Sequence, residues 1–136
     1  MKVLADTPVW SAALRRPEGP PDLLRRTMET LVAHGLVAIV GPIRQEILSG
    51  IREQAKFEQV RAALRHFPDL ALQTDDFETA AGYFNFCRKR GVQGSMTDFL
   101  ICAVAMRHEL EIFTTDGDFA HYRKHLPIAL YAPAGK

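Results

Sequence analysis

The chain has 136 residues, 47% of them hydrophobic, which is enough for one domain with a core that needs no disulfide or structural metal. Its 17 basic and 16 acidic side chains give a net charge of +1, which excludes a protein that is strongly basic or strongly acidic as a whole. Any contact with nucleic acid must therefore come from local clusters of positive charge.

The N-terminal segment and the cysteines indicate the compartment. Three apolar residues precede Asp6, too few for a signal peptide, and no run approaches the roughly 20 apolar residues of a membrane span. Cys87 and Cys102 lack any metal-binding or redox spacing. We therefore expect a cytosolic protein with two buried free thiols and no membrane contact.

The first part of the chain predicts two strand and helix pairs. Residues 2–5 form a short apolar strand, and Thr7, followed by proline, is typical of a helix cap. Asp22 is expected to cap the next helix, which ends at Gly35. A second buried strand is expected over residues 36–40.

The middle of the chain continues the alternation. A helix is expected from Gly41 until it is interrupted at Ser49. Apolar residues at helical spacing predict another helix over residues 54–67, and a brief strand is expected over residues 70–73.

The last part predicts three helices and two strands. Acidic residues at one end and basic residues at the other mark a helix over residues 75–90. A nearly all-apolar helix over residues 95–108 precedes a strand over residues 111–115, and a short helix over residues 119–125 precedes a final strand over residues 128–131. The pattern has no repeat or linker and predicts one domain over residues 1–136: a three-layer α/β/α fold with a mostly parallel central sheet.

Four acidic residues occupy related places in this scheme. Asp6 and Asp116 each follow a predicted strand, while Glu46 and Asp98 lie in early turns of helices. Ligands of open parallel sheets bind beyond the carboxyl ends of the strands, so these side chains can converge there. Converging carboxylates repel one another unless a cation lies between them, and hard ions such as Mg²⁺ or Mn²⁺ prefer oxygen ligands. One or two such ions would suit metal-assisted phosphodiester cleavage.

Each acidic residue also has an ordinary interpretation. Asp98 and Asp118 are well placed to cap helices or to favour their positive N-terminal ends, and Glu46 can be a solvated helix residue. Asp98, however, directly precedes the very apolar run FLICA, so its helix is expected to be largely buried with its N-terminus facing a ligand.

Four segments resemble, in order, the signature blocks of PIN-domain ribonucleases, and most of all the VapC-type toxins of prokaryotic toxin–antitoxin pairs. These segments read LADTPVW, PIRQEILSG, TDFLICAVAMRH and FTTDGDF, and they span nearly the whole chain. The resemblance implies an endoribonuclease that depends on Mg²⁺ or Mn²⁺ and cuts single-stranded or loop RNA. It also implies a homodimer built from helices and a small antitoxin protein, a segment of which occupies the crevice.

Carried over by position, the resemblance makes Asp6 and Asp98 the principal metal ligands. Glu46 and Asp116 complete the acidic pocket, and Asp118 is a further contributor ranked behind Asp116 as a metal ligand. Thr7 and Thr114 match hydroxyl residues that flank the acids in the family, although capping explains them slightly better.

The basic residues are mostly expected on solvated helix faces. Arg15, Arg16 and Arg44 lie nearest in sequence to Asp6 and Glu46 and are the candidates for contacts with RNA phosphates. Two other functions stay open: a non-catalytic RNA-binding PIN scaffold, and, ranked lower, a phosphatase or receiver-like domain that also uses acidic residues at strand ends.

Overall fold

The computed structural model describes residues 2–14 and 22–133. Four strands form one parallel sheet in the order β2-β1-β3-β4. Their bounds are β1 (Val3–Ala5), β2 (Val37–Ala38), β3 (Glu111–Phe113) and β4 (Ala129–Leu130). The first strand is therefore central, between strands that come much later in the chain.

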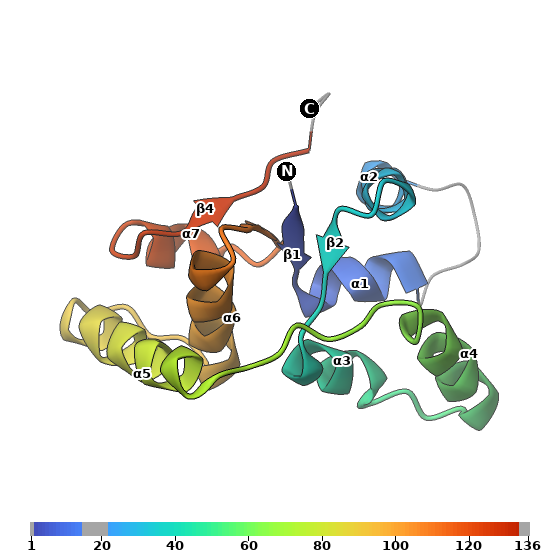
Figure 1. Cartoon of the computed structure of the whole chain (residues 1–136), viewed down its shortest axis with the longest axis horizontal. Helices are drawn as coiled ribbons and strands as arrows, with labels where there is room; N and C mark the ends of the chain where they lie inside the picture. Colours follow the sequence, from blue (N-terminus) through green and yellow to red (C-terminus); the bar gives the residue numbers. More distant parts are fainter. Residues whose placement is uncertain (1, 15–21, 134–136) are drawn as a thin grey trace.

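In Figure 1 the helices form two groups, one on the side of β2 and one on the side of β4. Those on the β2 side are α1 (Thr7–Leu14), α2 (Leu23–Ala33), α3 (Gly41–Leu48) and α4 (Gln54–Leu64). Those on the β4 side are α5 (Thr74–Lys89), α6 (Met96–Arg107) and α7 (Asp118–Arg123). The predicted α/β/α fold with a parallel sheet is confirmed.

Most predicted boundaries agree with the structure because local capping sets them. Asp22 accepts a hydrogen bond from the backbone N–H of Arg25 at 2.9 Å and so caps α2. Gly35 follows the end of that helix with a φ of 67°, a conformation that costs glycine little. Both cysteines are free and buried, as expected.

The strand predicted over residues 70–73 is wrong. One isolated bridge, between Ile39 and Asp69, is all that this region adds to the sheet. The backbone beyond it has other partners, because the carbonyl of Ala71 accepts from Arg107 and the N–H of Gln73 donates to Asp76. These contacts hold the segment as a connection to α5 rather than as a strand.

The core surrounds β1, whose three residues are completely buried. Trp10 on α1 is also buried, and its indole N–H donates to the carbonyl of Ala5 at 3.1 Å while its ring packs edge-on against Phe67. Residues 99–105 of α6 are buried on every face. None of the described helices has the length and apolar character needed to cross a membrane.

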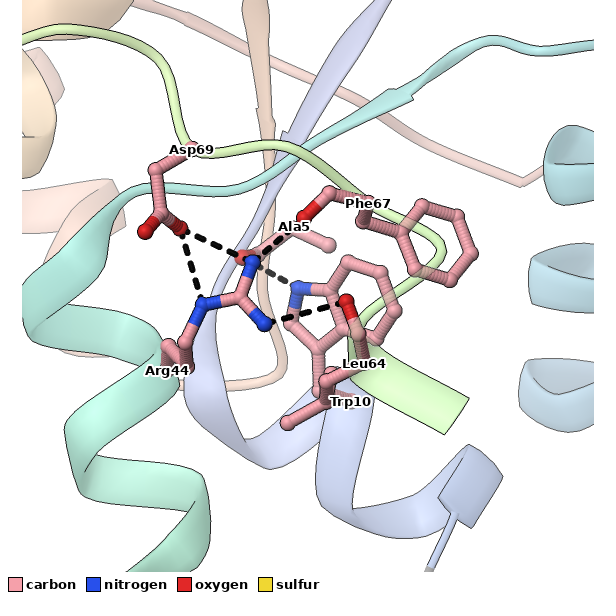
Figure 2. A network of polar contacts seen from close by, with 6 residues as sticks. All are labelled: Ala5, Trp10, Arg44, Leu64, Phe67 and Asp69. Atoms are coloured by element: carbon pink, nitrogen blue, oxygen red, sulfur yellow. Dashed lines mark hydrogen bonds and ion pairs between the residues drawn. The ribbon is translucent and has the colours of Figure 1, made fainter. Parts of the chain in front are cut away.

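Arg44 fastens α3 to the end of α4 (Figure 2). Its Nε donates to Asp69 and its Nη1 to the carbonyl of Leu64, both at 3.0 Å, and its Nη2 donates to the carbonyl of Phe67. Each of the three nitrogens therefore already has a partner within the protein. These contacts give Arg44 a stabilising role, and we expect them to compete with the RNA contact predicted for it.

Candidate active site

The sheet order brings Asp6 and Asp116 to the same edge. Strands β1 and β3 are parallel neighbours in which Ala5 pairs with Phe113, so their carboxyl ends lie together. The backbone N–H of Asp6 extends this pairing by donating to the carbonyl of Phe113 at 2.8 Å. The prediction that residues following these two strands meet beyond the sheet is thus explained by register.

Asp6 is the most constrained of the acidic residues. Its side chain is buried, with 5% of the residue exposed, and each carboxylate oxygen has a donor. The N–H of Thr7 donates to Oδ1 at 2.8 Å, and the hydroxyl of Thr114 donates to Oδ2 at 2.9 Å. Burial raises the pKa of Asp6 above its ordinary value, the charges of Asp98 and Glu46 add to this rise, and the two hydrogen bonds oppose it.

Thr7 links Asp6 to the acidic residue of α3. Its hydroxyl donates to Oε1 of Glu46 at 2.7 Å, so the hydroxyl does not cap α1. The helix begins at Thr7, and the preceding residue, Asp6, supplies the carbonyl that accepts from the N–H of Trp10. The preference for Thr7 as a cap was therefore wrong, since the side chain instead orients Glu46.

Asp98 lies in the first turn of α6 without capping it. The cap is Ser95, whose hydroxyl oxygen accepts from the backbone N–H of Asp98 at 3.0 Å. The carboxylate of Asp98 accepts instead from the hydroxyl of Tyr122, at 2.6 Å on Oδ2. Burial raises the pKa of Asp98 and the charge of Asp116 raises it further, whereas the hydrogen bonds from Tyr122 and Ser95 lower it.

Asp116 and Asp118 differ in where their charges act. The N–H of Asp116 donates to the hydroxyl oxygen of Thr114 at 3.0 Å, and Oδ1 of Asp116 accepts from the N–H of Asp118 at 2.9 Å. Both residues are exposed and the charges of both act on Tyr122, but the charge of Asp116 also acts on Asp98. This coupling favours Asp116 over Asp118 as a member of the acidic set.

The acidic set has the donor chemistry of a magnesium or manganese site, although its ligands are not drawn together. Within residues 2–14 and 22–133, no three His, Cys, Asp or Glu side chains stand close enough to hold an ion as they are. All four members offer carboxylate oxygens, and the charges of Asp98 and Glu46 penalise ionisation of Asp6. A cation would remove that penalty, so the residues fit a hard divalent ion by chemistry and by charge.

Sequence reasoning missed the outer partners of the acidic residues. Ser95 was open to prediction, because Ser followed three residues later by an acidic residue is a known helix start. Tyr122 gave no signal, since its contact with Asp98 joins residues 24 positions apart on different helices. Arg15 and Arg16 lie outside the described residues.

Comparisons with known proteins identify the family of this chain. The PIN domain family model matches residues 3–125. "VapC ribonuclease Mb1587" of Mycobacterium bovis and "Ribonuclease VapC11" of Mycobacterium tuberculosis are each 31% identical over 120 residues, which is 86% of this chain and 88% of the relative.

Solved structures give the same fold at lower identity. FitAcB from Neisseria gonorrhoeae superposes with a TM-score of 0.77 at 19% identity, covering 98% of this chain and 99% of the other. VapBC2 from Rickettsia felis, bound to a DNA fragment from its promoter, superposes with a TM-score of 0.76 at 15% identity, covering 96% and 98%. With the acidic residues placed at the ends of β1 and β3 and the family model matched over nearly all of the described residues, this chain belongs to the PIN-domain family.

Proposed function

We propose that this protein is an endoribonuclease dependent on Mg²⁺ or Mn²⁺ and the toxin of a type II toxin–antitoxin pair. The observation that carries the proposal is the coupled acidic set: Asp6, Glu46, Asp98 and Asp116 come from four separate segments, and their charges act on one another. Repulsion among these carboxylates destabilises the metal-free protein, and a bound cation replaces the repulsion with attraction.

In this proposal Asp6 and Asp98 would hold the ion, Asp116 and then Asp118 would be further ligands, and Glu46 would complete the acidic pocket. The bound ion would lower the pKa of an attacking water and stabilise the oxygen that leaves the phosphodiester. The chain's own hydroxyls prepare the ligands, because Thr114 and Thr7 fix the carboxylates of Asp6 and Glu46.

The names of the similar proteins support the proposed substrate and the proposed partner. The curated relatives at 31% identity are named as ribonucleases, which supports RNA as the substrate here. A structure from Klebsiella pneumoniae, at 21% identity and a TM-score of 0.64, is a toxin–antitoxin complex, and this supports an antitoxin as the inhibiting partner. Two free buried thiols support action in the reducing cytoplasm.

A non-catalytic scaffold is the weaker alternative. A domain that only bound RNA would have no need to keep a buried Asp6 and a half-buried Asp98 ionisable, each with its carboxylate held by a hydroxyl. The receiver-like alternative ranks lower still, because the PIN family model covers the chain.

Purified protein is expected to cut single-stranded RNA in Mn²⁺ or Mg²⁺ and to lose this activity in EDTA. At low RNA concentration, cleavage should fall steeply with added salt, because phosphate contacts release counterions and each contributes a slope of about −0.7 in log rate against log salt. Arg15→Ala and Arg16→Ala should each make the slope shallower by about that amount. The measurement is initial rate across a series of potassium chloride concentrations.

Arg44 and Arg52 provide the controls. Arg44→Ala should lower the unfolding temperature and leave the salt slope unchanged, because its guanidinium is bound within the protein. Arg52→Ala, at an exposed position, should change neither quantity. Unchanged slopes for both Arg15→Ala and Arg16→Ala would place the RNA path elsewhere, and cleavage that persists in EDTA would overturn the metal requirement.

The homodimer is proposed to form through α5 and the start of α6. Two large apolar side chains there face solvent, since Phe77 is 53% exposed and Met96 is 81% exposed. Both line a hollow of about 250 Å³ whose other walls are nearly all apolar. Such a surface is a typical protein contact, and a second copy of the chain would cover it.

Phe77→Asp and Met96→Asp are expected to convert the dimer into a monomer, because each places a charge in this apolar contact. Light scattering coupled to size exclusion measures the mass directly. Leu23→Asp is the matched control on α2, where an apolar side chain is 37% exposed away from the hollow, and it should stay dimeric. A monomeric parent protein, or dimers in both α5 and α6 variants, would contradict the assignment of this surface.

A further inference from the structure

Tyr122 is a buried tyrosine whose hydroxyl is committed to one acidic residue. The residue has no exposed surface, and its ring packs against Phe99 and Phe119 with centroid distances of 4.8 and 5.1 Å. A buried hydroxyl needs a partner, and this one donates to Oδ2 of Asp98 at 2.6 Å. The rigid packing of the ring therefore fixes where that carboxylate oxygen lies.

Gly94 makes this contact geometrically feasible. A Cβ atom built at Gly94 would lie 2.2 Å from the hydroxyl oxygen of Tyr122 and 2.6 Å from Cζ. Real Cβ atoms essentially never come this close to another heavy atom, so any larger residue at this position must displace the tyrosine. Tyr122 can therefore occupy its position beside α6 only because Gly94 has no side chain.

The chemistry of the donor also matters. A lysine or arginine at this place would hold Asp98 equally well but would cancel its charge, whereas a phenol is neutral. A phenol is protonated at neutral pH and a carboxylate can only accept, so the hydroxyl of Tyr122 is the donor in this contact. Tyr122 therefore fixes Oδ2 of Asp98 with a neutral donor, and the carboxylate keeps its negative charge.

We infer that Tyr122, seated against Gly94, is a positioning residue that holds Oδ2 of Asp98 so that the rest of this carboxylate faces the acidic set as a metal ligand. This inference rests on the proposed function. Hydrogen bonds behind a metal ligand typically contribute about 10-fold to 100-fold to metal affinity or activity. The structure places Tyr122 in that outer position.

The test compares Tyr122→Phe with Tyr131→Phe. The first removes one hydroxyl and keeps the buried ring, and the second removes a hydroxyl for which no partner was found among the described residues, on a ring packed against Phe113. Mn²⁺ affinity is measured by titration calorimetry on the metal-free protein, and RNA cleavage is measured over a range of Mn²⁺ concentrations. Tyr122→Phe should bind Mn²⁺ about 10-fold more weakly and need correspondingly more Mn²⁺ for half-maximal cleavage, whereas Tyr131→Phe should match the parent.

Two glycine substitutions test whether Gly94 is needed to seat Tyr122. Gly94→Ala should weaken Mn²⁺ binding at least as much as Tyr122→Phe, because the methyl group displaces the hydroxyl. Gly82→Ala, in a helix position with nothing within 4 Å of the added atom, should raise the unfolding temperature slightly and leave Mn²⁺ binding unchanged.

The outcomes separate the two proposals. If the parent neither binds Mn²⁺ nor cuts RNA, the proposed function fails. If the parent does both and Tyr122→Phe has the parent's affinity and Mn²⁺ requirement, the proposed function stands and the positioning role is overturned. A Tyr122→Phe variant that is less stable but has an unchanged Mn²⁺ requirement also overturns it, because the hydroxyl would then serve only the fold.

Discussion

Asp98→Asn is expected to reduce RNA cleavage by more than about 100-fold, since it removes a proposed metal ligand rather than a group behind one. Asp6→Asn should have a comparable effect. The same substitutions should leave the metal-free protein as stable as the parent or more stable, because burial and neighbouring carboxylates oppose ionisation at both positions. Cleavage in Mn²⁺ and thermal unfolding in EDTA measure the two effects on the same samples.

The raised pKa values of Asp6 and Asp98 also predict the direction in which stability changes with pH. The raised pKa values mean that the folded protein binds more protons than the unfolded chain between pH 3.8 and the folded pKa values. The stability of the parent should therefore fall as pH rises through this window, and each Asn variant should lose part of that slope. Glu78→Gln, at an exposed position on α5, is the control and should change neither cleavage nor slope. Retained cleavage, or a stability loss of several kcal/mol, would defeat the assignment of these residues as ligands.

Arg107→Met is expected to lower the free energy of unfolding by about 3 kcal/mol, the largest stability effect predicted for this chain. Asp76 is only 2% exposed and accepts from Nε of Arg107 at 2.6 Å and from Nη2 at 2.9 Å. Removing the arginine leaves a buried carboxylate without its counter-charge, and it also frees the carbonyl of Ala71. Urea denaturation at pH 7 measures the loss.

This ion pair also sets the behaviour in acid. The hydrogen bonds from Arg107 lower the pKa of Asp76, so its contribution to stability is present above pH 3.8 and is lost as pH falls through the lower folded value. In Arg107→Met the contribution is lost already at higher pH. Arg61→Met is the matched control, since it breaks an ion pair with Glu58 in which both side chains are 47% exposed, and it should cost less than about 1 kcal/mol. Equal losses for the two variants would show that Asp76 and Arg107 do not act as a buried pair.

Local patterns in the sequence account for the elements and for the general place of the acidic residues. Asp22 and Gly35 bound α2 because capping depends on residues within one turn. Asp6 and Asp116 could be assigned to one edge because parallel strands align their carboxyl ends. Each of these inferences needs only neighbours in sequence or a general property of parallel sheets.

The contacts that could not be predicted join distant residues. Arg44 is close to Glu46 in sequence, yet its partners lie 20 to 25 residues further along the chain, and they give it a stabilising role that no local pattern indicates. The hydroxyl of Thr7 serves Glu46, 39 residues away, and not its own helix. Residues 70–73 have the composition of a strand, but Arg107 takes up a carbonyl of this segment from a distance of 36 residues. Such partners are set by packing, which no local pattern reports.

The bond between Thr114 and Asp6 joins residues 108 positions apart, which has a consequence for the order in which the protein matures. During synthesis the side chain of Asp6 leaves the ribosome long before β3 and Thr114, which hold it in place. A nascent or truncated chain ending before residue 111 therefore has neither Thr114 nor Asp116, and its central strand lacks the neighbour β3. The acidic set is therefore completed only after β3 and the residues that follow it have been synthesised.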